Sequence, residues 1–72
     1  MTEDFEGYFL RTRCGRRSDG RYGVAVLIET SVGGVVRREK FIDRAVSFTL
    51  EVEAEKEAIN FGKNLIRRKM NR

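Results

Sequence analysis

A run of arginines that ends the first apolar segment and fills the loop after it is the densest group of side chains able to do binding chemistry. Phe9 lies just before its members, which are Arg11, Arg13, Arg16, Arg17 and Arg21. Guanidinium groups bind phosphate oxygens through paired hydrogen bonds, and an exposed aromatic ring can stack on a base. The pattern is therefore typical of a surface that binds DNA or RNA. The alternative is that these arginines only keep a half-exposed sheet soluble.

The sequence offers few groups for catalysis. It contains no histidine and one cysteine, Cys14, so triads that need an imidazole and histidine-containing zinc sites are excluded. Neighbouring arginines could lower the pKa of the Cys14 thiol, but no base is in view and an incidental cysteine is the better interpretation. We assign no catalytic residues and expect a binding module that is not an enzyme, without cofactor or small-molecule substrate.

Two further patterns fail as ligand-binding motifs. Gly15 and Gly20 have the spacing of a phosphate loop, but Arg21 and Tyr22 stand where lysine and a hydroxyl residue are needed. A set of alternate glutamates scatters around a helix instead of converging on a metal ion, so no metal site is assigned. These glutamates are Glu51, Glu53, Glu55 and Glu57.

Three apolar segments bounded by turn residues predict three strands, at about residues 5–13, 22–31 and 35–42. Asp19-Gly20 predicts a turn between the first two segments. Gly33-Gly34 predicts a tight hairpin between the second and third, because glycine adopts positive φ without strain. The third segment is rich in charge, which is typical of an edge strand.

The last part of the chain predicts one helix, at about residues 50–69, with Thr49 as its N-cap. Acidic residues crowd its start and basic residues its end, as the helix dipole favours. Alternation over residues 47–53 also fits a strand, and this alternative stays open. The predicted fold is α+β, with a three-stranded antiparallel meander followed by one helix packed on one sheet face (β-β-β-α). Residues 1–72 form a single small domain.

Alternation along the predicted strands divides their side chains between two faces. Tyr8 and Leu10 would share the helix side with the valines and isoleucine of the second strand, so Phe9, Arg11 and Arg13 would point to the other side. The third strand adds Arg37 in one register, or Arg38 and Lys40 in the other. The predicted nucleic-acid-binding residues are Phe9, Arg11, Arg13, Arg16, Arg17, Arg21, Arg38 and Lys40.

The predicted helix carries two apolar stripes, and Gly62 beside the first would allow close approach to the sheet. The first stripe consists of Leu50, Ala54, Ala58, Phe61 and Leu65. The second consists of Val52, Ile59, Ile66 and Met70. Either the sheet and its flanking loops cover both stripes, or the second is an interface for another copy or a protein partner. A protein-interaction or homodimerising module is therefore the alternative to nucleic-acid binding.

Composition bounds the setting of the protein. The chain has 72 residues, a net charge of +4 and no proline. One cysteine cannot form an internal disulfide, which fits a reducing compartment. No apolar run has the length of a signal peptide or a membrane span. We therefore expect a cytoplasmic protein with no membrane partner.

An aromatic-threonine pair leads into an acidic, alanine-bearing helix at the end of the predicted sheet. The residues of this pattern are Phe48-Thr49, Glu53-Ala54-Glu55, Ala58, Gly62 and Ile66. Together with the order of elements, the pattern resembles a group of short, uncharacterised bacterial β-β-β-α proteins, which implies the layout but no activity. The layout also resembles the three-stranded DNA-binding domains of phage integrases and plant AP2-type regulators. That second resemblance implies a basic sheet face that enters the major groove of DNA.

Overall fold

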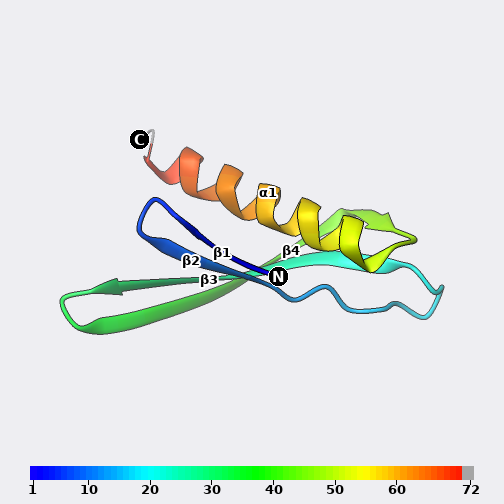
Figure 1. Cartoon of the computed structure of the whole chain (residues 1–72), viewed down its shortest axis with the longest axis horizontal. Helices are drawn as coiled ribbons and strands as arrows, with labels where there is room; N and C mark the ends of the chain where they lie inside the picture. The colour runs from blue at the N-terminus through cyan, green and yellow to red at the C-terminus, as the bar shows by residue number, and fades with distance from the viewer. Residues whose placement is uncertain (71–72) are drawn as a thin grey trace.

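One antiparallel sheet with a helix on one face makes up the computed structural model, which describes residues 1–70 (Figure 1). The strands follow one another across the sheet in chain order. The elements are β1 (Thr2–Phe5), β2 (Tyr8–Thr12), β3 (Tyr22–Val32), β4 (Val35–Phe48) and α1 (Glu51–Met70). The α+β arrangement is confirmed, but the predicted three-stranded sheet is wrong, because the sheet has four strands.

The additional strand arises because the first predicted strand is a hairpin. Phe5 pairs with Tyr8 across a two-residue turn, in which Glu6 has φ of 53° and Gly7 has φ of 83°. Two positive φ values in a two-residue loop are those of a type I′ turn. Glutamate rarely adopts positive φ, so this turn has only a weak sequence signal. The acidic segment before the turn, most of which lies outside the predicted strands, forms the edge strand β1.

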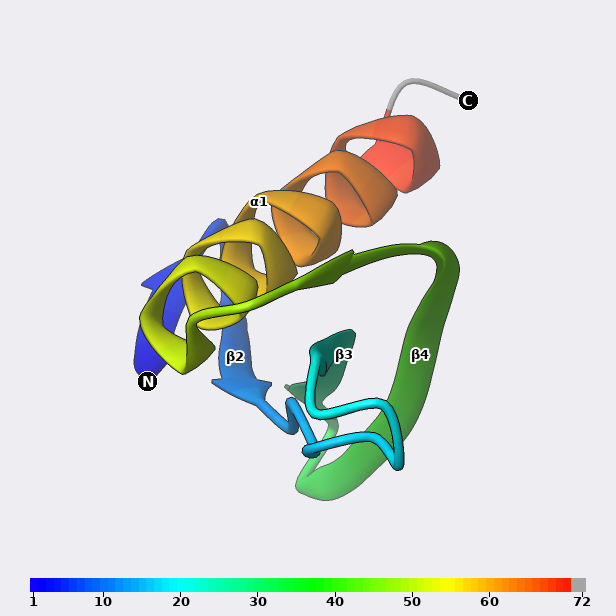
Figure 2. The same cartoon turned by 90° about the vertical axis from the view of Figure 1, so that its right-hand side faces the viewer.

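The last strand is longer than predicted because its pairing with β3 is interrupted and then resumes. Val24 pairs with Asp43, whereas the preceding Gly23 pairs with Ser47. The intervening residues bulge, and the Ala45 amide donates a hydrogen bond to Asp43 Oδ1 at 3.0 Å. Such a bulge bends a strand, and Figure 2 shows β4 curving across the end of the sheet toward the start of α1.

The helix begins one residue later than predicted and is not capped as expected. The strand runs to Phe48 and the helix starts at Glu51, so residues 47–53 are divided between the two elements. The Leu50 carbonyl accepts the first helical hydrogen bond, from the Ala54 amide at 3.2 Å. Leu50 therefore occupies the cap position predicted for Thr49.

The core forms where α1 crosses the middle strands. Leu10, Val24 and Val26 are fully buried on the sheet, and small helix residues approach them. A Cβ atom at Gly62 would lie 3.3 Å from Leu10 Cδ2 and from Val26 Cγ2. The predicted close approach at Gly62 is thus confirmed.

The helix face that meets the sheet is rotated from the predicted one. Ile59 and Ile66 are only 5% and 2% exposed and belong to the core. Leu50 and Val52, by contrast, are 55% and 48% exposed. The second stripe is therefore not a continuous exposed surface, and the wide contact with the sheet accounts for its two isoleucines. The side chain of Met70 lies outside the described part of the structure.

Contacts between β1 and α1 hold the extra edge strand in place. Lys63 forms an ion pair with Glu3, and the Lys63 ammonium and the Arg67 guanidinium lie 5.5 and 5.2 Å from the centre of the Phe5 ring. Cations over an aromatic ring are attracted by its negative face. Two of the basic residues near the end of α1, Lys63 and Arg67, therefore hold β1 against the helix.

Candidate nucleic-acid interface

The helix covers one face of the sheet and leaves the other uncovered. Cross-strand partners share a face, so the register assigns each side chain. Arg11 pairs with Leu27, and Leu27 pairs with Lys40. The next row contains Asp4, Phe9, Glu29 and Arg38 in the same way. We call the surface made by these two rows and Arg13 the open face.

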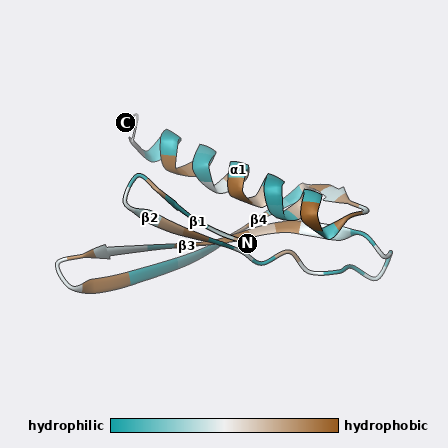
Figure 3. Cartoon of the chain, in the orientation of Figure 1, coloured by the Kyte–Doolittle hydropathy of each residue, from teal (hydrophilic) through white to brown (hydrophobic). Residues whose placement is uncertain are grey.

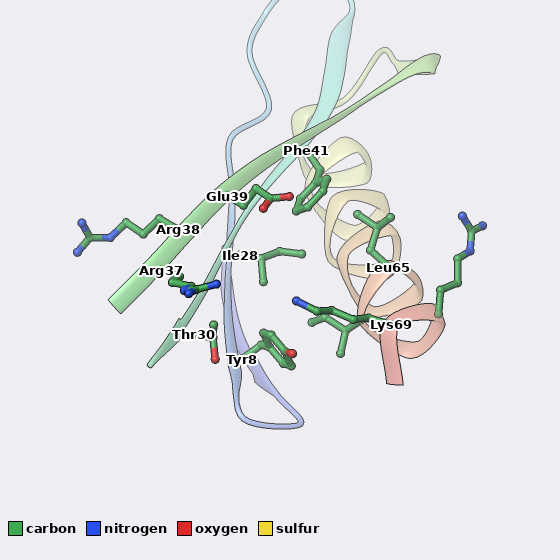
Figure 4. A pocket seen from close by; sticks show the side chains of 11 residues that line it. Tyr8, Ile28, Thr30, Arg37, Arg38, Glu39, Phe41, Leu65 and Lys69 are labelled. Carbon is green, nitrogen blue, oxygen red and sulfur yellow. The ribbon is translucent and has the colours of Figure 1, made fainter. Parts of the chain in front are cut away.

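The register settles the phase of β4 that alternation alone left open. Arg38 and Lys40 lie on the open face, whereas Arg37 pairs with Thr30 on the helix side. Figure 4 shows the same division, because Arg38 points away from the helix-side hollow and Arg37 points toward it. The predicted residues Arg38 and Lys40 are therefore brought together with Phe9 and Arg11.

One row of the open face is already engaged in internal contacts. Arg38 Nε lies 3.2 Å from Glu29 Oε1 and donates a hydrogen bond to it. The Arg11 guanidinium lies 5.6 Å from the centre of the Phe9 ring, and Phe9 is half-buried. Base stacking on Phe9 would therefore require Arg11 to move. Arg11 itself is exposed and can turn to a phosphate.

A basic groove of about 470 Å³ continues the open face between β4 and the loop that follows β2. Its floor includes Ala25, and the backbone at Gly23 donates a hydrogen bond to the Gly15 carbonyl at 3.0 Å. Four cationic side chains line it, and Asp43 is the single acid among the lining residues. The cations of this basic groove are Arg13, Arg17, Lys40 and Arg44.

Sequence reasoning missed Arg44 because it lies in the bulge of β4. A bulge breaks the alternation that assigns side chains to faces. The bulge turns Arg44 and Val46 toward the groove lining. The run from Asp43 to Ser47 gave no turn signal of glycine or proline, so nothing in the sequence marked it.

Arg21 is used to build the loop. Its Nε donates to Ser47 Oγ and its Nη2 donates to the Ser47 carbonyl, both at 2.7 Å. Arg17 forms a longer ion pair of 3.4 Å with Asp19. Arg16 is exposed, and its backbone forms a bridge with Tyr22. The structure therefore places Arg13 and Arg17 at the groove, Arg16 outside it, and Arg21 in a structural contact.

The thiol of Cys14 is not activated by the arginines around it in the sequence. Burial raises the pKa of Cys14, and the carboxylates of Glu55 and Glu51 raise it further. The hydrogen bond that Sγ donates to the Ala25 carbonyl is long, at 3.8 Å. The lowered pKa considered from the sequence is thus wrong. Cys14 packs against the core.

A second hollow, of about 500 Å³, lies on the helix side of the sheet between α1 and the β3–β4 hairpin (Figure 4). Arg37 and Lys69 point toward it from opposite sides. Its apolar lining residues are Tyr8, Ile28, Phe41 and Leu65. Figure 1 shows that the β3–β4 hairpin extends beyond the end of α1.

Comparisons with known proteins give no family for the chain. No protein-family model matches it, and no match was found among curated proteins or solved structures. The four-stranded sheet also differs from the three-stranded layout on which both resemblances depend. Over residues 1–70, no cluster of three or more potential metal-ligating side chains occurs. No helix in the same range is long and apolar enough to span a membrane.

Proposed function

We propose that the protein is a non-enzymatic module that binds DNA or RNA through the phosphate backbone, with the open face and the basic groove as its contact surface. The observation that carries this proposal is the position of Arg11, Arg13 and Lys40 on one uncovered sheet face, next to Arg17 and Arg44 across the groove. A cytoplasmic location belongs to the same proposal, since the single cysteine suits a reducing compartment.

Charge supports contact with phosphates over contact with a neutral partner. Arg11 and Arg13 are exposed, as are Lys40 and Arg44. Glu29 forms an ion pair with Arg38, and Asp43 accepts a hydrogen bond from the backbone of the bulge. Asp4 lies at the β1 end of the Phe9 row and does not line the basic groove. The remaining cations can release counterions from a nucleic acid when they bind its phosphates, which is the main source of sequence-independent affinity.

The shape and charge of the basic groove also favour contact with the phosphate backbone of a nucleic acid over recognition of its bases. Arg13 and Arg17 line it with Lys40 and Arg44, while Ala25 lies at its floor, so the cations surround an apolar, concave surface. An arginine guanidinium can donate two parallel hydrogen bonds to one phosphate group. Base-specific readout usually needs a helix or ribbon that enters a groove of the duplex. We therefore expect affinity with little sequence preference.

A salt series tests this proposal. Fluorescence anisotropy with labelled single-stranded and duplex oligonucleotides of one sequence should give micromolar binding at low salt. The logarithm of the binding constant should fall with the logarithm of salt concentration with a slope of about −3 to −4, since roughly four cations would contact phosphates. Affinity weaker than about 1 mM at low salt, or a slope near zero, contradicts the proposal.

A further inference from the structure

The outer edge of β4 is an unused pairing surface. The strand is the last in the sheet, and within the described residues no strand pairs with its other side. All residues from 31 to 40 are exposed. A long edge with free amide and carbonyl groups is a template for a further strand.

The arm that carries this edge projects away from the rest of the molecule. Figure 1 shows the β3–β4 hairpin extending past α1 and past the β1–β2 turn. Its end is apolar, as the hydropathy colours of Figure 3 show. Val35 and Val36 are 60% and 54% exposed. Neither the helix nor the first hairpin therefore obstructs an approaching strand.

The first half of β4 is self-complementary in one antiparallel register. With a two-fold axis at Arg38, Arg37 lies opposite Glu39 of the second copy, and Val35 lies opposite Phe41 of the second copy. The axis repeats each pair, giving two ionic and two apolar contacts on the helix side. Opposite charges and apolar pairs directly across an antiparallel ladder are stabilising.

The neighbouring two-fold registers lack this match. An axis at Glu39 would place Arg38 opposite Lys40 and Val35 opposite Asp43. An axis at Arg37 would place Val35 opposite Glu39. Like charges opposite one another, or an apolar residue opposite a charge, weaken a ladder. The register centred on Arg38 also has mismatches, with Arg38 opposite Arg38 and Val36 opposite Lys40 on the open face, but it alone of the three forms two opposite-charge pairs.

We propose that two copies of this chain associate through β4, in the antiparallel register centred on Arg38. On the open face the two Arg38 side chains meet, each held by Glu29 of its own copy at 3.2 Å, which reduces their repulsion. A two-fold axis perpendicular to the sheet keeps both helices on one side and both open faces on the other. The interface is isologous, so it closes after two copies.

The proposal does not depend on nucleic-acid binding, because the ionic and apolar pairs that favour the dimer lie on the helix side of β4, away from the open face. The contact is short and is expected to be weak, with a dissociation constant between about 1 µM and 1 mM. All tests therefore use the protein alone, without nucleic acid. A failure to dimerise leaves the proposal for the open face untouched.

Disulfide trapping tests the register. In a Cys14→Ala background, Arg38→Cys puts a thiol on the proposed axis. This thiol lies opposite the same thiol of the second copy. Lys40→Cys puts a thiol on the same face and edge, but opposite Val36 of the second copy and about 14 Å along the strand from the matching thiol, at about 3.4 Å per residue. Under mild oxidation the first variant should form covalent dimers at least about tenfold faster than the second, since disulfides need Cα atoms within about 7 Å. Equal rates, or no dimer, overturn the proposal.

Charge exchange provides a second test. In sedimentation velocity, Arg37→Glu and Glu39→Arg should each weaken association by about tenfold, because each places like charges opposite one another twice in the dimer. The double variant should restore association to near the wild-type level. A wild-type protein that stays monomeric up to about 1 mM, or a double variant no better than the single ones, contradicts the register.

Discussion

The guanidinium of Arg21 donates hydrogen bonds to both Ser47 Oγ and the Ser47 carbonyl, each at 2.7 Å, and so joins the loop after β2 to the end of β4. Arg21 looked like a ligand-binding residue because it follows a run of arginines. Its partner lies 26 positions away in the sequence, on a strand that bends back through a bulge. The contact closes one end of the sheet and positions the loop that forms one wall of the basic groove.

The first prediction concerns this contact. Arg21→Ala should lower the free energy of unfolding by about 1 kcal/mol, because it leaves the Ser47 groups without a donor at a partly exposed site. Arg16→Ala removes the same charge from the same loop and should change stability by less than about 0.5 kcal/mol. Urea unfolding followed by circular dichroism measures both. Equal effects would show that Arg21 does not hold the loop.

The second prediction concerns the open face. Arg11→Ala combined with Arg13→Ala should weaken nucleic-acid binding and reduce the salt slope by about 2, because two phosphate contacts are lost. Stability should change little, since both arginines are exposed.

Lys56→Ala combined with Arg68→Ala is the matched control. It removes the same charge from exposed positions on α1 and should leave the salt slope within about 0.5 of wild type. If both double variants weaken binding equally, binding depends on the net charge of the protein, and the open face is not the contact surface.

The third prediction separates the core side of α1 from its exposed side. Ile66 is 2% exposed and Val52 is 48% exposed, although both belong to the same predicted stripe. Ile66→Ala should cost about 2 to 5 kcal/mol, through lost burial and the cavity left behind. Val52→Ala should cost less than about 0.5 kcal/mol. Thermal unfolding of the two variants gives the comparison, and similar costs would contradict the observed rotation of the helix.

The fourth prediction follows from Cys14. Burial raises the pKa of its thiol, so iodoacetamide should alkylate the folded protein with a midpoint at higher pH than it alkylates the urea-unfolded chain. Only the thiolate reacts. A midpoint at or below that of the unfolded chain would show an activated thiol.

The same shift affects stability at alkaline pH. The unfolded chain releases the thiol proton at a lower pH than the folded protein, so the contribution is complete below the pKa of the unfolded thiol and declines as pH rises from there through the raised folded pKa. Urea unfolding from pH 7 to 10 should therefore show a steeper loss of stability for wild type than for Cys14→Ala. Parallel curves for the two proteins would contradict the raised pKa.

Local patterns in the sequence predicted the parts of the fold that depend on neighbouring residues. The helix at 50–69 matches α1 within one residue at each end, because its acidic start, basic end and apolar period are local features. Gly33 and Gly34 form the predicted tight hairpin, with φ of 58° and 80°. The division of β2 and β3 into a helix side and an open side was also correct, since alternation follows from strand geometry alone.

The tertiary structure alone decided what these elements do. The turn at Glu6 requires a conformation that glutamate rarely adopts, and the phase of β4 depends on pairing with β3, because charged residues occupy both of its sides. Which side of α1 is covered depends on how the helix packs on the sheet, and in that packing Ile59 and Ile66 are buried and Val52 is not. The run of arginines was visible in the sequence, but its division between the open face, the basic groove and the contact with Ser47 depends on long-range contacts.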